Sequence, residues 1–130
     1  MAEILIIDDE APVRTLVRRA LGMHGHDVTE AHDGLQGIAR YAAAPTDLVI
    51  TDLVMDGMEG MDTIRGIRRL NPDVPILAIS GGGRGAAGDY LTIAAALGAT
   101  ETMEKPFGLQ ELSETVERLL EGSTEGRPKG

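Results

Sequence analysis

The residues with the greatest chemical potential stand where short apolar runs end. They are three carboxylates, a hydroxyl and an ammonium group: Asp8, Asp9, Asp52, Ser80 and Lys105. If these runs are parallel strands, their carboxyl ends meet at one edge of a sheet. Carboxylates that are crowded together repel one another, and one of them takes up a proton unless a cation neutralises the group. The pattern therefore predicts a cation site at that edge.

The type of ligand indicates which cation this is. Oxygen ligands without histidine or cysteine favour Mg²⁺ or Mn²⁺ over zinc, and Mg²⁺ often completes its shell with a phosphate oxygen. A carboxylate can act as a nucleophile and form an acyl phosphate. Transfer of a phosphoryl group then needs mainly positioning and charge neutralisation, which a metal and a lysine supply. We expect a site that handles phosphoryl groups.

The elements that position these residues alternate along the chain. Five stretches are predicted as strands, three as continuous apolar runs and two with weaker patterns: 4–7, 48–50, 76–79, 26–31 and 101–104. Between and after them, apolar residues recur with helical spacing around residues 13–21, 35–42, 61–67, 93–97 and 109–120. Pro12 suits the opening turn of the first helix, and Glu10 is expected to be an acid at its N-terminus. Five strands alternating with five helices predict an α/β fold with a parallel sheet and right-handed crossovers.

Length and composition limit the class of protein. The chain has 130 residues and is expected to form one domain, over residues 1–121, followed by a polar and disordered tail at 122–130. A formal net charge of −9 argues against binding nucleic acid or an anionic membrane. There is no cysteine, the N-terminal residues lack the pattern of a signal peptide, and no window resembles a membrane span. We expect a cytoplasmic protein.

Four motifs in order resemble the receiver domain of bacterial two-component response regulators. They are the acidic pair at 8 and 9, the aspartate at 52, the serine at 80 followed by a small residue, and Lys105-Pro106-Phe107. The resemblance covers about residues 3–121. It implies the flavodoxin-like (βα)5 fold, with a five-stranded parallel sheet of order 2-1-3-4-5 and helices on both faces. It also implies a single-domain receiver without an effector domain in the chain.

The resemblance also implies a role for each site residue. Asp52 would accept the phosphoryl group from a histidine of a sensor kinase or a histidine phosphotransfer protein. Asp8, Asp9, Asp52 and the backbone carbonyl of Val54 would hold Mg²⁺, for which Mn²⁺ can substitute. Lys105 would pair with the phosphoryl oxygens and Ser80 would move toward them, while Pro106 would follow a cis peptide bond. The chain would then bind an unknown downstream protein or pass the phosphoryl group on.

The sequence departs from the family pattern at several positions. Thr102 stands where family members commonly carry an aromatic residue that turns inward on activation, so signalling is expected to use another rearrangement. Val54 and Gly82 occupy positions that influence hydrolysis of the acyl phosphate, and neither side chain can orient a water, which predicts slow self-dephosphorylation. The glycine-rich loop at 80–88 is expected to be mobile, with a frayed helix after it.

Other interpretations remain open. The chain could be an interaction module that keeps the fold but accepts no phosphate, although its acidic residues argue against this. A small flavin-binding protein of the same topology would need a hydroxyl-rich phosphate loop after the first strand and aromatics around the ring, whereas this chain has acids there and three aromatics. Residues 81–85 lack the spacing of a nucleotide-binding loop. The three histidines, His24, His26 and His32, have no metal-site spacing and are expected at surface or turn positions.

Overall fold

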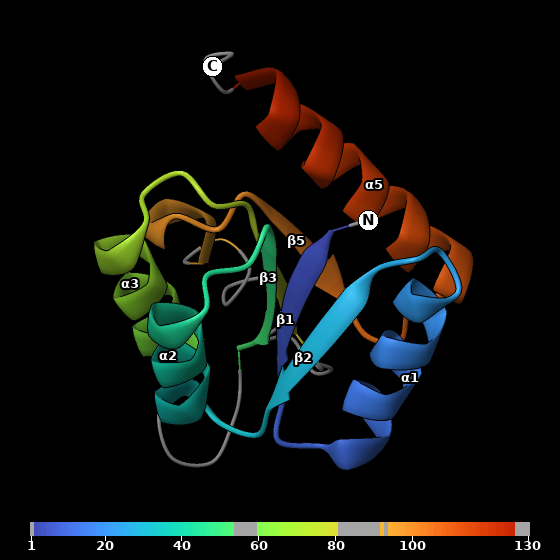
Figure 1. Cartoon of the computed structure of the whole chain (residues 1–130). Helices are drawn as coiled ribbons and strands as arrows, with labels where there is room; N and C mark the ends of the chain where they lie inside the picture. The colour runs from blue at the N-terminus through green and yellow to red at the C-terminus, as the bar shows by residue number, and fades with distance from the viewer. Residues whose placement is uncertain (1, 54–59, 81–91, 93, 127–130) are drawn as a thin grey trace.

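A five-stranded parallel sheet forms the centre of the molecule (Figure 1). The computed structural model describes residues 2–53, 60–80, 92 and 94–126. The strands are β1 (Glu3–Ile7), β2 (Asp27–Ala31), β3 (Leu48–Asp52), β4 (Ile76–Ser80) and β5 (Glu101–Glu104). Their order across the sheet is β2-β1-β3-β4-β5, and every neighbouring pair is parallel. The predicted flavodoxin-like order is confirmed.

Helices cover both faces of this sheet. They are α1 (Ala11–Gly22), α2 (Gly34–Ala43), α3 (Gly60–Leu70) and α5 (Leu109–Gly126), and residues 92 and 94–97 are also helical. Figure 1 shows α1 and α5 on one side of the sheet and α2 and α3 on the other. The predicted fourth helix and the glycine-rich loop before it, which were expected to be frayed and mobile, lie largely outside the described residues.

Each face of the sheet has its own apolar core. Alternate residues of β1 point to opposite faces, so Ile4 and Ile6 pack with α1 and α5, whereas Leu5 and Ile7 pack with α2 and α3. All residues of β3 and β4 are buried. This burial on both faces explains why the strands read as continuous apolar runs rather than as an alternating pattern.

Glycines allow close approach between elements on the α2 and α3 side. A Cβ atom at Gly37 would lie 2.4 Å from Cδ1 of Ile7, a side chain of β1. A Cβ atom at Gly60 would lie 2.3 Å from the carbonyl oxygen of Asp52 and 2.4 Å from Cα of Leu53. Real Cβ atoms essentially never come within 3.0 Å of such neighbours. The first turn of α3 therefore rests directly on the backbone at the end of β3.

The final helix is longer than the sequence pattern predicts. Helix α5 continues to Gly126, so residues 122–126 are helical where a disordered tail is expected. Extending an existing helix adds a hydrogen bond for each residue fixed and avoids the cost of nucleation, so polar residues without apolar periodicity can continue it. The last residues of the predicted tail, 127–130, lie outside the described residues.

His26 also differs from its expected place. His24 and His32 are exposed, as predicted, but the His26 side chain is only 6% exposed. Its Nδ1 accepts a hydrogen bond from the Ala2 N–H at 3.0 Å, and its Nε2 lies 2.7 Å from Oε2 of Glu117. The imidazole thus joins the start of β1 to α5, a long-range contact that residue spacing does not reveal.

No helix in the described part of the chain is long and apolar enough to cross a membrane.

Candidate phosphoryl and metal site

Backbone hydrogen bonds that continue the sheet place the site residues at its carboxyl edge. The Asp8 N–H donates to the Ala31 carbonyl at 3.1 Å, and the Lys105 N–H donates to the Ser80 carbonyl at 2.8 Å. Asp52 is the last residue of β3 and pairs in register with Ile79. Residues far apart in sequence are therefore held on the rigid end of the sheet.

Three carboxylates meet at this edge. Asp8, Asp9 and Asp52 each offer an oxygen, and these three atoms lie within 4.8 Å of one another. Asp8 and Asp52 are buried, whereas Asp9 is exposed. Carboxylates this close disfavour joint ionisation unless positive charge compensates them.

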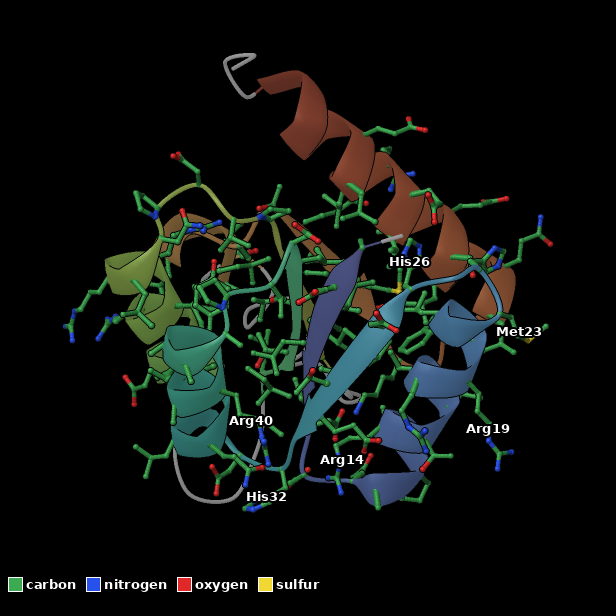
Figure 2. The ribbon with its side chains drawn as sticks, in the orientation of Figure 1. Arg14, Arg19, Met23, His26, His32 and Arg40 are labelled. Atoms are coloured by element: carbon green, nitrogen blue, oxygen red, sulfur yellow. The ribbon has the colours of Figure 1, made fainter. Side chains whose placement is uncertain are left out.

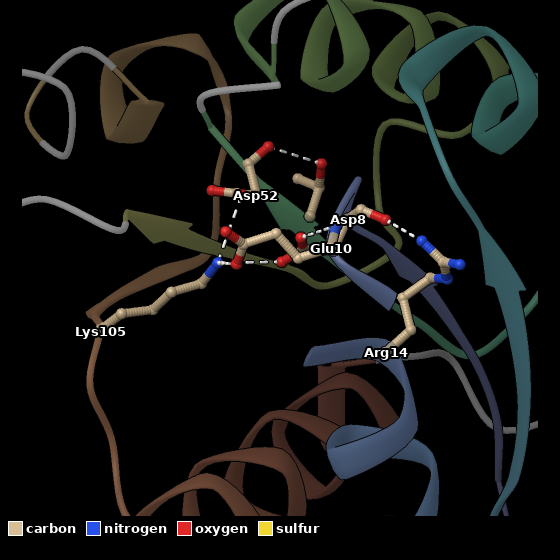
Figure 3. Close-up of polar contacts among 6 residues, drawn as sticks. Asp8, Glu10, Arg14, Asp52 and Lys105 are labelled. Atoms are coloured by element: carbon tan, nitrogen blue, oxygen red, sulfur yellow. Dashed lines mark hydrogen bonds and ion pairs between the residues drawn. The ribbon is translucent and has the colours of Figure 1, made fainter. Parts of the chain in front are cut away.

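Lys105 provides part of that positive charge (Figure 3). Its Nζ lies 3.0 Å from Oδ2 of Asp8 and 3.3 Å from Oδ2 of Asp52. A third acid, Glu10, has its Oε1 at 3.5 Å from the same Nζ. The lysine side chain is only 16% exposed. An ammonium with little access to water, between two buried carboxylates, interacts with them more strongly than a surface lysine would.

Asp8 is the most constrained of the three acids. Its Oδ1 accepts a hydrogen bond from the Glu10 N–H at 2.9 Å, and its Oδ2 contacts Lys105. The Arg14 guanidinium donates to the Asp8 carbonyl at 2.7 Å and also pairs with Glu30 at 3.1 Å. The Glu10 amide and Lys105 thus hold the side chain of Asp8, while Arg14 of α1 holds its backbone carbonyl.

Burial and charge oppose each other in this cluster. Burial raises the pKa of Asp8 above its ordinary value, and the Glu10 amide and Lys105 only partly offset this. Burial alone would lower the pKa of Lys105, but the Asp52 and Asp8 carboxylates outweigh it and the pKa is raised. Lys105 therefore stays protonated, and the cluster retains a net negative charge that would favour a cation.

Two hydroxyl groups accompany the acids. Thr51 Oγ1 donates a hydrogen bond to the Asp52 carbonyl at 3.0 Å, which restrains the backbone at the end of β3. Ser80 is fully buried, and among the described residues its Oγ has no hydrogen-bond partner. A buried hydroxyl without a partner costs free energy, so this position is suited to receive a polar ligand atom.

Several other predicted residues can also be placed. The Lys105–Pro106 peptide bond is cis, the isomer that the resemblance implies. Thr102 lies in the edge strand β5, where it pairs in register with Ala78 and is half-buried. Val54 and Gly82, with their predicted effects on the metal and on dephosphorylation, lie outside the described residues.

Sequence reasoning did not foresee two contacts at this site. Glu10 occupies the N-cap position of α1 but makes no side-chain capping hydrogen bond, because its carboxylate contacts Lys105 instead. Arg14 supports Asp8 from one turn into the same helix. No motif marks either residue; only their place in the first turns of a helix that begins beside the acidic pair could have suggested them.

The arrangement suits a divalent cation together with a phosphoryl group. Three carboxylate oxygens in one small space match the preference of Mg²⁺ for a few carboxylates completed by water or phosphate. Lys105 and Ser80 add a cation and a buried hydroxyl at the same edge. The donor set thus fits Mg²⁺ or Mn²⁺ and contains no histidine or cysteine.

Comparison with known proteins places the chain in a family. A family model described as the response regulator receiver domain matches residues 4–117. The chain is 37% identical over 125 residues to the DNA-binding transcriptional regulator NtrC of Azospirillum brasilense, covering 95% of this chain and 25% of that protein. It is 32% identical over 117 residues to the response regulator MprA of Mycobacterium avium, covering 90% of this chain and 50% of that protein.

Solved structures agree with these matches. The crystal structure of the receiver domain of NtrX from Brucella abortus superposes with a TM-score of 0.84 at 32% identity, covering 91% of this chain and 98% of that one. By contrast, the chain spans only a quarter to a half of the length of the curated relatives it matches. The likeness to those relatives therefore concerns their receiver part.

Proposed function

Since the receiver model spans most of its length, the chain belongs to the response regulator receiver family of phosphorelay signalling, and we propose that Asp52 is its phosphoryl acceptor. The donor is a phosphohistidine of a sensor histidine kinase or of a histidine phosphotransfer protein. One observation carries the assignment: Lys105 Nζ lies 3.0 and 3.3 Å from two buried carboxylates that also form an acidic triad with Asp9.

Asp52 is a better acceptor than Asp8 on structural grounds. Both oxygens of Asp8 are held, one by the Glu10 amide and one by Lys105. Asp52 ends β3, the middle strand of the sheet, at the carboxyl edge where ligands bind in such folds. Asp8 then serves as a metal ligand and as a positioning group for Lys105.

In the transfer step, an Asp52 carboxylate oxygen attacks phosphorus and forms the new O–P bond. The P–N bond to the donor imidazole breaks, and its electron pair stays on the departing nitrogen. Lys105 holds the side chain of Asp52 and neutralises negative charge on the phosphoryl oxygens. The product is an acyl phosphate, so the chain acts as a phosphoprotein switch rather than as an enzyme with a separate substrate.

Asp8, Asp9 and Asp52, with the Val54 carbonyl as a further proposed ligand, would hold Mg²⁺ in this site. When bound, Mg²⁺ supplies charge neutralisation and a fixed orientation for the phosphoryl oxygens. The hydroxyl of Ser80, buried and without a partner in the described part of the chain, supplies a donor for a phosphoryl oxygen after transfer. That new bond is the proposed origin of altered binding to a downstream protein, or of onward transfer.

Intact-mass spectrometry tests the proposal. The protein is incubated with acetyl phosphate, with Mg²⁺ or with EDTA, and the mass is followed with time. We expect a gain of one phosphoryl group that depends on Mg²⁺. Asp52→Asn should abolish the gain, because an amide oxygen is a poor nucleophile. Asp62→Asn is the matched control, since this exposed aspartate lies on α3 and should leave phosphorylation unchanged.

A second donor makes a negative result decisive. If acetyl phosphate gives no product, the same assay is run with a phosphorylated histidine kinase. Failure with both donors would refute phosphoryl acceptance and would favour a binding module that accepts no phosphate. Equal phosphorylation of wild type and Asp52→Asn would refute the choice of acceptor.

A further inference from the structure

A groove of about 650 Å³ separates the end of α1 from α5. It is lined by Ala20, Met23, His24, Leu109, Gln110, Ser113, Glu114, Glu117, Arg118 and Glu121. Met23 and His24 follow the last turn of α1, whereas the acidic pair precedes its first turn. A helix of this length rises about 18 Å, so this end of the groove is remote from the phosphoryl site. In Figure 2, Met23 lies beside the start of α5, at the opposite end of α1 from Arg14.

The groove combines exposed apolar side chains with negative charge. Met23 is 85% exposed and Leu109 is 46% exposed, and they line the same groove. Three glutamates line the α5 side: Glu114, Glu117 and Glu121. The groove therefore offers exposed apolar side chains next to carboxylates on one wall.

Within the described residues, most of this negative charge is not neutralised. Arg118 is the one lysine or arginine among the lining residues, and it pairs with Glu101 of β5. Among the ion pairs of the described residues, neither Glu114 nor Glu121 takes part; Glu114 accepts a hydrogen bond from the Gln110 amide. Glu117 contacts His26. A partner with positive charge would therefore find unneutralised carboxylates.

We propose that this groove binds an amphipathic helix of another protein, with an apolar ridge flanked by lysine or arginine. Leucine-like side chains at i, i+3 or i+4, and i+7 would contact Met23 and Leu109, in the helix-in-groove mode. The flanking basic residues would pair with Glu114 and Glu121. The net charge of −9 favours a cationic partner over a second copy of this chain, because two copies repel each other. This interaction is separate from phosphoryl acceptance and does not depend on it.

A designed peptide serves as the probe. It has 18 residues, with leucines on one helical face and lysines beside them, and carries a fluorophore for anisotropy. One control peptide has the same composition in scrambled order, and another replaces every lysine by glutamate. We expect saturable binding of the amphipathic basic peptide, at least tenfold weaker binding of both controls, and weakening as salt is raised.

Protein variants locate the binding. Met23→Lys removes an exposed apolar side chain from the groove and adds one positive charge. Leu35→Lys makes the same change on α2, on the other face of the sheet, at a leucine that is 65% exposed. We expect Met23→Lys to weaken binding at least tenfold and Leu35→Lys to change it less than twofold. Glu121→Lys should also weaken binding, with Asp62→Lys on α3 as its matched control.

Each contrary outcome overturns the proposal. Equal binding of the scrambled peptide would show general attraction to an acidic protein, and equal binding of the glutamate peptide would show that charge plays no part. Equal effects of Met23→Lys and Leu35→Lys on peptide binding would show that the peptide binds outside the groove. Absence of binding at millimolar peptide would refute the proposal. Dimerisation of the wild type in sedimentation velocity that Met23→Lys abolishes would assign the groove to a second copy instead.

Discussion

Replacing Gly60 by alanine tests how closely α3 rests on the end of β3. The added Cβ would lie 2.3 Å from the Asp52 carbonyl oxygen and 2.4 Å from Cα of Leu53, where at least 3.0 Å is needed. Both neighbours are backbone atoms, so neither can rotate away as a side chain could. The start of α3 must therefore retreat by several tenths of an ångström from the strand that carries Asp52.

The expected magnitude follows from two opposing terms. Overpacking of this kind costs about 1–3 kcal/mol, whereas replacing glycine by alanine in a helix gains about 1 kcal/mol. We expect Gly60→Ala to lower the free energy of unfolding by up to about 2 kcal/mol. Urea unfolding followed by circular dichroism measures this difference.

The same substitution in an open position provides the control. A Cβ atom at Gly22, the last residue of α1, would have nothing within 4 Å. Gly22→Ala should therefore raise stability by up to about 1 kcal/mol, through helix propensity alone. If Gly60→Ala is as stable as Gly22→Ala, the close contact of α3 with β3 does not constrain the fold and the reasoning is wrong.

Three further predictions concern buried charge. Burial raises the pKa of Asp8 above 3.8, so its ionisation costs folding free energy as the pH rises through the folded-state pKa. In EDTA, Asp8→Asn should therefore be more stable than wild type in urea unfolding at pH 7, with the advantage shrinking toward pH 4; a constant difference would contradict this. Lys105→Gln leaves Asp52 without its ammonium and should slow phosphorylation by acetyl phosphate at least tenfold, measured as mass gain, and an unchanged rate would count against its role. Arg68→Leu removes guanidinium hydrogen bonds to the carbonyls of Gly98 and Val74 and should lower the free energy of unfolding by roughly 2–4 kcal/mol; a loss below about 1 kcal/mol would show that water replaces them.

The sheet could be predicted because its strands are buried on both faces. The apolar runs at 4–7, 48–50 and 76–79 fall within β1, β3 and β4, and the chemically active residues follow directly from where these runs end. The start of α1 could also be predicted, since Pro12 stands in its first turn. The apolar pattern of parallel strands was enough to bring Asp8, Asp52 and Lys105 to one edge, whereas the order of the strands came from the family resemblance.

Contacts between distant side chains could not be predicted in this way. The bridge from His26 to Ala2 and Glu117 depends on how α5 crosses the start of the sheet, which no local pattern encodes. Arg68 is a similar case, because its carbonyl partners are placed by the tertiary structure. Glu10 does stand at the start of α1 as predicted, but its contact with Lys105 was not foreseen, because acids at helix starts usually act on the helix itself.

The position of Lys105 also has a consequence for how the chain matures. Its contact with Asp8 joins residues 97 apart in sequence, and its contact with Asp52 joins residues 53 apart. β1 and β3 leave the ribosome well before β5, which is an edge strand. Until Lys105 has been synthesised and has reached the sheet, Asp8 and Asp52 have no ammonium to compensate their charge, so burying them is unfavourable.

The acidic pocket is therefore completed by Lys105, which directly follows the last strand of the described sheet. A nascent chain that stops before β5 has the proposed acceptor, Asp52, but not the lysine that neutralises it. If Asp52 is the acceptor, we expect incomplete chains to accept a phosphoryl group poorly, because the ammonium that compensates the acids is still missing.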